Sequence, residues 1–187
     1  MIYLSKGILP WKPAVDSVSV SHCGALHKLT GIQADLWLAG QYRPGLTKND
    51  EQDAAVKALA NIGIVERGDE SDVAALFRLL INCVICPTRV KPGAAFLNSH
   101  EHRLWRWIRF AGLRLTIAEL TLLAERSAKP VSELLGTENR QELTELIYTG
   151  EIIGDGILET LMEHSPARDA TVQAVLGLLR KKKIYLI

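Results

Sequence analysis

The feature that most constrains this fold is a helix end that runs through a short break directly into a few strand-forming residues. Residues 54–66 (AAVKALANIGIVE) place an alanine- and leucine-rich helix end before Gly63, which the β-branched pair Ile64 and Val65 follows. Similar segments occur at residues 143–153 and 175–187. Glycine commonly ends a helix, and β-branched residues favour strands. The pattern therefore predicts a mainly α-helical fold with short strands, of the α+β class.

The composition indicates an ordinary soluble globular protein. The 187 residues are 48% hydrophobic and 23% charged, with a net charge of +1, and this length allows one large domain or two small ones. The apolar runs are much shorter than the ~18 residues of a membrane span. The N-terminus lacks the pattern of a secretory signal, and three cysteines give no disulfide framework. We therefore expect a cytoplasmic protein with no membrane partner.

Turn-forming residues suggest where the chain divides. Pro87 and the run Lys91-Pro92-Gly93 mark residues 87–98 as the best candidate for a linker. This predicts an N-terminal domain over residues 1–86 and a C-terminal helical domain over residues 99–187. In the N-terminal domain we expect strands at 2–4, 17–21 and 64–65, and helices at 25–29, 30–40, 48–61 and 72–82, the last as an extra packing helix.

In the second half, capping signals place most of the helices. Ser99 can cap a helix to about residue 111, and Thr116 with Glu119 has the spacing of a capping box that opens a helix to about residue 127. Further helices are expected at 137–150, 157–163 and 166–183. Residues 184–187 resemble residues 2–4 in sequence, so we expect these two segments to pair as strands.

Positive charge is concentrated in one segment. Residues 89–114 contain Arg89, Lys91, Arg103, Arg106, Arg109 and Arg114 against Glu101 alone. Arg103, Arg106 and Arg109 share one helix face, and arginines in this arrangement bind phosphates or carboxylates. The alternative is a solvated face whose Arg stems cover apolar surface. The cluster at residues 180–183 is open to two similar interpretations, a contact with DNA phosphate or a helix C-terminus held in water.

The candidate chemical motifs are weak. Cys83 and Cys86 have the C-x-x-C spacing, but they follow an apolar helix, and His100 and His102 do not have the spacing of a zinc finger. We expect ordinary buried cysteines. No nucleophile, nucleotide-binding or metalloprotease motif occurs in the sequence. The sequence therefore predicts a non-enzymatic protein with no catalytic or metal-binding residues and no cofactor.

One part of the sequence resembles a known family. A β-rich lead-in is followed by GALHKLTGIQADLWLAG and then by a helix that ends ALANIGIV. This order resembles the PqqD-like winged-helix fold over roughly the first 70 residues, at Leu36, Trp37, Gly40, Leu59, Gly63, Ile64 and Val65. Proteins of that family bind leader peptides by adding the peptide as a strand against the sheet and the third helix. The second half is similar only in outline to winged-helix DNA-binding domains, so the resemblance implies two winged-helix-like halves with small β-ribbons.

Two functions follow from these patterns. The first is a helix-turn-helix type of transcription regulator whose C-terminal half presents residues 166–183 to a major groove. Its candidate DNA-binding residues are Arg103, Arg106, Arg109, Arg168, Gln173, Arg180, Lys181 and Lys182. The second is a peptide or protein recognition module that uses the strand edge at Ile64 and Val65, with Leu59 and Trp37 beside it. Paired winged helices often act as dimers, which makes a second copy of the chain a candidate partner.

Overall fold

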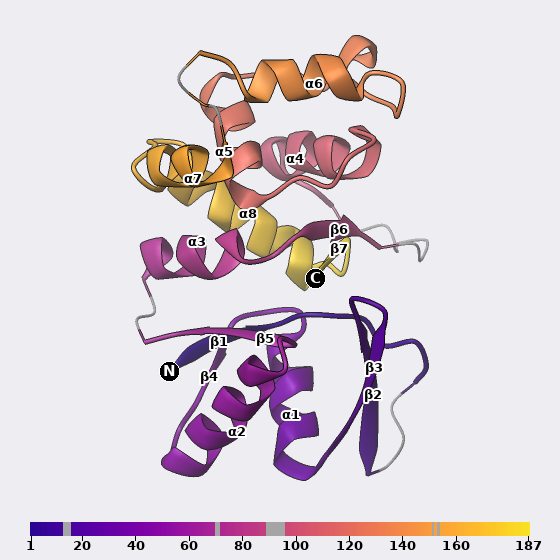
Figure 1. Cartoon of the computed structure of the whole chain (residues 1–187), viewed down its shortest axis with the longest axis vertical. Helices are drawn as coiled ribbons and strands as arrows, with labels where there is room; N and C mark the ends of the chain where they lie inside the picture. Colours follow the sequence, from indigo (N-terminus) through magenta and orange to yellow (C-terminus); the bar gives the residue numbers. More distant parts are fainter. Residues whose placement is uncertain (13–15, 70–71, 89–95, 151, 153) are drawn as a thin grey trace. The chain divides into compact units, whose positions relative to one another are not determined.

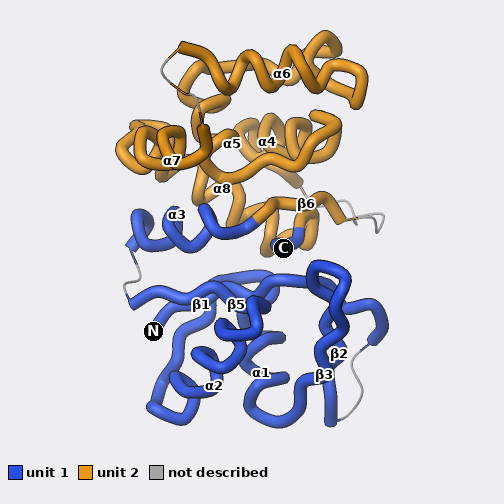
Figure 2. The backbone as a smooth tube through the Cα atoms, viewed as in Figure 1, with its two compact units in different colours: residues 1–83, 185–187 blue, residues 84–184 orange. Residues whose placement is uncertain are grey.

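The computed structural model describes residues 1–12, 16–69, 72–88, 96–150, 152 and 154–187. Within these residues it has eight α-helices, one short 3-10 helix and small antiparallel sheets. This confirms the predicted class, a mainly helical fold with short strands. The chain forms two compact units, the first made of Met1–Cys83 with Tyr185–Ile187 and the second of Val84–Ile184 (Figure 2). Every helix of the described residues is too short or too polar to cross a lipid bilayer.

The observed division differs in detail from the predicted domains 1–86 and 99–187. The units meet at Cys83 and Val84, and the last three residues belong to the first unit. A backbone hydrogen bond explains this assignment, because the Gly7 amide donates to the Leu186 carbonyl at 2.7 Å. Most of the predicted linker, residues 89–95, lies outside the described residues.

The first unit is built around a three-stranded sheet with the order β4-β1-β5. Its strands are β1 (Ile2–Ser5), β4 (Gly45–Leu46) and β5 (Val65–Gly68), and Ser5 of β1 lies opposite Val65 of β5. Helices α1 (Gly31–Gly40) and α2 (Asp50–Asn61) lie on one side of β1 and β5, and α3 (Val73–Ile81) lies on the other (Figure 1). The edge of β5 therefore runs between two helical layers.

The core of the first unit lies between the sheet and helices α1 and α2. It joins apolar residues of both helices to residues of β1, β5 and the neighbouring hairpin. The Tyr3 hydroxyl donates to the Leu36 carbonyl at 3.1 Å, and the Ser5 hydroxyl donates to the Trp37 carbonyl at 2.8 Å. The Trp37 indole in turn donates to the Lys6 carbonyl at 3.1 Å. These three bonds hold α1 against β1 where water is excluded, so each buried donor is satisfied.

A hairpin replaces one predicted helix. Residues 25–29 were expected to be helical, but they belong to β3 (Ala25–Thr30), which pairs with β2 (Ser17–His22). His22 lies opposite Ala25, so the loop contains only Cys23 and Gly24, with φ values of 47° and 83°. Two consecutive positive φ values match the right-handed twist of a hairpin. The prediction was wrong because this tight turn outweighs the helix-forming tendency of Ala, Leu and Lys.

The second unit is mainly helical. It contains α4 (Ser99–Phe110), α5 (Ile117–Glu125), the 3-10 helix η1 (Ser132–Leu134), α6 (Arg140–Ile147), α7 (Asp155–Glu163) and α8 (Arg168–Arg180). Helix α8 packs against α4 and α5, and α5 also contacts α6 and α7. The predicted capping box of Thr116 and Glu119 is confirmed. For α4, Asn98 rather than Ser99 is the capping residue, and it forms a second capping box with Glu101.

The strand at the C-terminus does not pair as expected. We predicted that residues 184–187 would pair with residues 2–4, but β7 (Ile184–Leu186) forms a two-stranded sheet with β6 (Ile85–Pro87). Beside this sheet, the Thr88 amide donates to the Lys183 carbonyl at 2.9 Å. Of the expected strand at 151–153, residues 151 and 153 lie outside the described residues.

Candidate functional site

The four side chains predicted to contact a peptide are all buried. Trp37, Leu59 and Ile64 are 0% exposed, and Val65 is 1% exposed. They belong to the core between the sheet and the helices α1 and α2. This corrects the prediction, because side chains that hold the core together cannot also reach a ligand. Any binding at this strand must use its backbone, further along toward Gly68.

The backbone of β5 is open beyond Val65. The Lys6 amide donates to the Ile64 carbonyl at 2.8 Å, whereas the Ile64 amide donates to the Leu59 carbonyl at 3.2 Å, so Lys6 and Ile64 occupy a hydrogen-bonded position of the ladder that is bonded in one direction only. Along two antiparallel strands, hydrogen-bonded residue pairs alternate with pairs that are not hydrogen-bonded to each other. The backbone groups of Glu66 and Gly68 therefore face β1, and those of Arg67 face away from it. Asp69 follows β5 at a bend, so the alternation holds only to Gly68. Because β5 is the outer strand of the sheet and Arg67 is exposed, the outward backbone groups of Arg67 lie at the open sheet edge.

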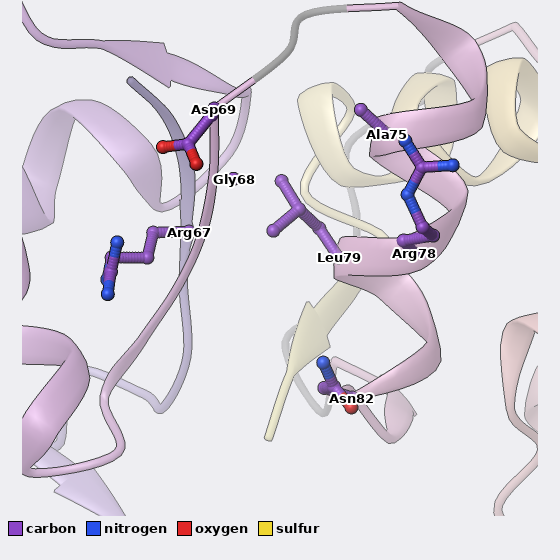
Figure 3. A pocket seen from close by; sticks show the side chains of 7 residues that line it. All are labelled: Arg67, Gly68, Asp69, Ala75, Arg78, Leu79 and Asn82. Carbon is purple, nitrogen blue, oxygen red and sulfur yellow. The ribbon is translucent and has the colours of Figure 1, made fainter.

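A groove of about 380 Å³ lies along this edge. Arg67, Gly68 and Asp69 line it from the strand, and Ala75, Arg78, Leu79 and Asn82 line it from α3 and its end. Leu79 points from α3 toward Gly68, whereas Arg67 and Asp69 extend from the opposite face of the strand (Figure 3). A Cβ atom added to Gly68 would lie 3.5 Å from Leu79 Cδ2. The absence of a side chain at Gly68 therefore leaves room between the strand and α3.

Charged groups fix the rim of the groove. Lys6 Nζ lies 2.7 Å from Glu66 Oε1, and the Asn82 side-chain amide donates to Glu66 Oε2 at 3.5 Å. Glu66 thereby links β1, β5 and the end of α3. Arg78 adds a positive charge beside an apolar floor of Ala75 and Leu79, whereas the charged groups of Arg67 and Asp69 lie on the other face of the strand (Figure 3). The arrangement offers backbone hydrogen bonds, an apolar contact and charged groups to one ligand.

Sequence reasoning missed the groove residues. They lie in the segment ERGDE, which continues the strand beyond its β-branched residues, and in α3, which was expected to serve only for packing. A signal was present: Gly68 stands between charged residues at the end of a strand, a position where a glycine often allows close approach of another backbone.

The three arginines of the basic segment share one exposed face of α4. Arg109 is exposed, and Arg103 and Arg106 are half-buried. Arg103 Nη2 lies 3.1 Å from His100 Nδ1, and the Arg109 guanidinium lies over the rings of Trp105 and Phe110. The structure therefore brings these three predicted DNA-binding residues together on one surface.

Helix α8, the predicted recognition helix, is mostly buried. Eight of its residues are buried, namely Thr171, Val172, Ala174, Val175, Leu176, Gly177, Leu178 and Leu179. Among its predicted contacts only Gln173 and Arg180 are exposed on the helix, with Lys182 exposed just after it. Because most of α8 is buried, the structure does not favour the predicted role of residues 166–183 in a major groove.

Two other predicted DNA-binding residues have partners within the protein. Lys181 Nζ lies 2.5 Å from Glu101 Oε2, and Glu101 is buried. Arg168 pairs with Asp169 at 2.7 Å and donates to the Glu163 carbonyl. Both side chains therefore stabilise the second unit.

The cysteines do not form a reactive pair. Cys83 and Cys86 are buried, and Cys23 is exposed at the hairpin turn. Burial raises the pKa of the Cys83 thiol to about 12, with a smaller lowering by Lys6 and a smaller raising by Glu66. The Arg114 guanidinium donates to Cys86 Sγ at 3.3 Å. Since the thiolate is the reactive form, Cys83 is held in its unreactive state at neutral pH.

These environments predict a clear difference in thiol reactivity. With an aromatic disulfide reagent at pH 8, we expect Cys23 to react quickly and Cys83 and Cys86 to react only when the chain unfolds. The absorbance of the released thiolate counts the reacted groups. A Cys23→Ser variant is the control and should lose the fast phase entirely. Two or more fast thiols in the native wild-type chain would contradict the buried environments.

A further cluster of titratable groups lies within the second unit. The Tyr148 hydroxyl lies 3.1 Å from Glu119 Oε1 and 2.5 Å from Asp155 Oδ1. Burial raises the pKa of Glu119, and burial with the Asp155 hydrogen bond raises the pKa of Tyr148. These contacts connect α5, the end of α6 and the start of α7. The described residues form no group of three or more His, Cys, Asp or Glu side chains placed to hold a metal ion.

Comparison with known proteins assigns the chain to no family. No protein-family model, no curated protein and no solved structure matches it.

Proposed function

We propose that the first unit recognises an extended peptide or protein segment by adding it as a strand to the open edge of β5. The observation that carries this proposal is the backbone of Arg67 on the outer strand β5, which faces away from β1 beside a groove bounded by α3. In strand addition, backbone hydrogen bonds supply affinity and adjacent pockets select side chains. The apolar floor of Ala75 and Leu79 gives one such pocket.

The arrangement of elements supports a winged-helix-like assignment for this unit. Helix α2 leads through Gly63 into β5, and β5 pairs with β1. The third helix of the resemblance, which leads into the strand, corresponds to α2, whereas the other wall of the groove is formed by α3, the helix expected only for packing. The proposed ligand position therefore shares the strand edge with the resemblance but uses a different helix.

Several expectations from the sequence accompany this proposal. They are a non-enzymatic role, a cytoplasmic location and a homodimeric state, all of which stay predictions. DNA binding also stays a prediction, but the burial of α8 does not favour it. The acidic first turn of α2, with Asp50, Glu51 and Asp53, does not favour phosphate binding either.

A pair of substitutions at Arg67 tests the proposal. The full chain is used to select binders from a displayed library of random peptides. Selected peptides are then measured against Arg67→Pro, which removes the outward N–H without removing a bond to β1, and against Arg67→Ala, which removes only the side chain. Loss of one donor to a buried carbonyl costs about 1–3 kcal/mol, so Arg67→Pro should weaken binding roughly tenfold or more.

The control separates backbone from side-chain effects. Proline is tolerated in an edge strand when its missing N–H faces away from the sheet, so the far-ultraviolet circular dichroism of Arg67→Pro should equal that of the wild type. Arg67→Ala should bind the same peptides with a much smaller loss. If no peptide is enriched, or if a well-folded Arg67→Pro binds as the wild type does, strand addition at this edge is wrong.

A further inference from the structure

The exposed face of α4 carries three arginines and the ring of Phe110, together with Ser99 and His102. At about 100° per residue, Arg103, Arg106, Arg109 and Phe110 fall on one arc of the helix. The single acidic residue of α4, Glu101, lies on the opposite side, buried and paired with Lys181 at 2.5 Å. No carboxylate among the described residues forms an ion pair with any of the three arginines. Their charge is therefore available to an external anion.

An aromatic ring lies within this cationic face. The Phe110 side chain is 47% exposed, and the Arg109 guanidinium lies 5.3 Å from its ring centroid and 5.6 Å from that of Trp105. The Gly136 amide donates to the Phe110 carbonyl at 2.6 Å, and Arg140 Nε donates to the Gly112 carbonyl at 2.6 Å. These bonds fix the backbone at the end of α4 against the segment that follows η1.

A groove of about 530 Å³ opens beside Phe110. Arg106 and Phe110 line one wall, and Ser132, Leu135, Gly136 and Glu138 line the other. The one acidic side chain, Glu138, folds back over its own loop, because a Cβ added to Gly136 would lie 2.5 Å from Glu138 Oε1. The groove thus joins an apolar surface, formed by Phe110 and Leu135, to the cationic face of α4.

We propose that this surface of the second unit binds single-stranded nucleic acid. One base would stack on the exposed ring of Phe110 at the groove, and the phosphates would follow Arg103, Arg106 and Arg109. Proteins that bind single strands combine a cationic track with aromatic rings on which unpaired bases stack. A duplex keeps its bases stacked and gives the ring nothing to contact, and an acidic peptide would use the arginines without requiring the ring. The site is separate from the peptide groove of the first unit.

Fluorescence anisotropy of a labelled oligothymidylate with the full chain tests this proposal. Binding should be clear at low salt and should weaken at higher salt, because phosphate contacts release counterions. Base stacking on an aromatic side chain contributes about 1–3 kcal/mol, so Phe110→Leu, which keeps the apolar volume but removes the ring, should weaken binding about tenfold. Arg106→Gln should weaken binding and reduce the salt dependence, whereas Glu138→Gln should strengthen binding.

Matched controls make each result decisive. Lys57→Gln removes an exposed positive charge from α2 and should leave oligothymidylate binding unchanged. A duplex of equal length and a polyglutamate peptide should bind more weakly than the oligothymidylate. The proposal is overturned by absence of binding at low salt, by unchanged affinity in a folded Phe110→Leu variant, or by a duplex or polyglutamate that binds at least as tightly.

Discussion

Replacing Trp37 by alanine should destabilise the first unit by about 3–5 kcal/mol, the usual cost of removing a buried tryptophan side chain. Trp37 is 0% exposed, and its indole donates to the Lys6 carbonyl at 3.1 Å. The substitution opens a cavity between α1 and the sheet and leaves that carbonyl without its donor. Since small domains are stable by only about 5–15 kcal/mol, a large part of the stability would be lost. Urea unfolding followed by circular dichroism measures the change.

Two further tryptophan variants show whether the loss of stability depends on burial and on the indole hydrogen bond. Trp11 is 61% exposed, so Trp11→Ala should change the free energy of unfolding by no more than about 0.5 kcal/mol. Trp37→Phe keeps most of the packing but removes the N–H donor, and it should cost an intermediate amount. An equal effect of Trp11→Ala and Trp37→Ala would contradict the position of Trp37 in the core.

Replacing Lys181 by methionine should destabilise the second unit by about 3 kcal/mol at neutral pH, because Glu101 would be left as an unpaired buried charge. The Glu101 side chain is only 6% exposed. Burial acts to raise the pKa of Glu101, but the hydrogen bonds from Lys181 and Asn98 and the charges of Lys181 and Arg180 together lower it. Methionine has a similar length, so the packing of the stem is retained.

The pH dependence of this variant follows from the sign of the pKa shift. In the wild type the lowered pKa means that the ionised pair stabilises the fold above the unfolded pKa of about 4.3 and that this contribution is lost as the pH falls through the folded pKa. In Lys181→Met only Asn98 and Arg180 still oppose the raising effect of burial, so the pKa of Glu101 should lie above its wild-type value. The stability deficit should therefore be largest at pH 7 and should shrink near pH 4, as urea unfolding at both values would show.

An exposed lysine provides the comparison for this effect. Lys57→Met, in α2, should change stability little at either pH because Lys57 is exposed. If the deficit of Lys181→Met is the same at pH 4 as at pH 7, Glu101 does not depend on Lys181 for its charge, and the ion pair has no stabilising role.

The sequence predicted elements where one local signal dominates. Thr116 and Glu119 formed the expected capping box, and the glycine stop at Gly63 led into β5 as expected. The sequence-based prediction was wrong where tertiary contacts determined the secondary structure. Residues 25–29 became β3 because the Cys23-Gly24 turn allows pairing with β2, and that turn is not one of the usual Asn-Gly or Asp-Gly pairs.

The candidate sites were predicted less well than the fold. Ile64 and Val65 were chosen as a binding edge because they are β-branched, but such residues fill the core, and the open backbone begins at Arg67. The role of α8 was inferred from its basic end, although residues 170–179 contain no charged side chain, and a helix that is apolar on all sides is buried. The arginines of α4 were grouped correctly because helix periodicity alone places them on one face.

Residue-resolved hydrogen exchange along β5, measured by NMR with and without a selected peptide, tests the central claim most directly. In the free chain we expect fast exchange at Arg67, whose amide faces away from β1, and slow exchange at Glu66 and Gly68, whose amides face it. A bound peptide should slow exchange at Arg67 and change Glu66 and Gly68 little. Slow exchange at Arg67 in the free chain, or unchanged exchange at Arg67 with peptide bound, would contradict strand addition at this edge.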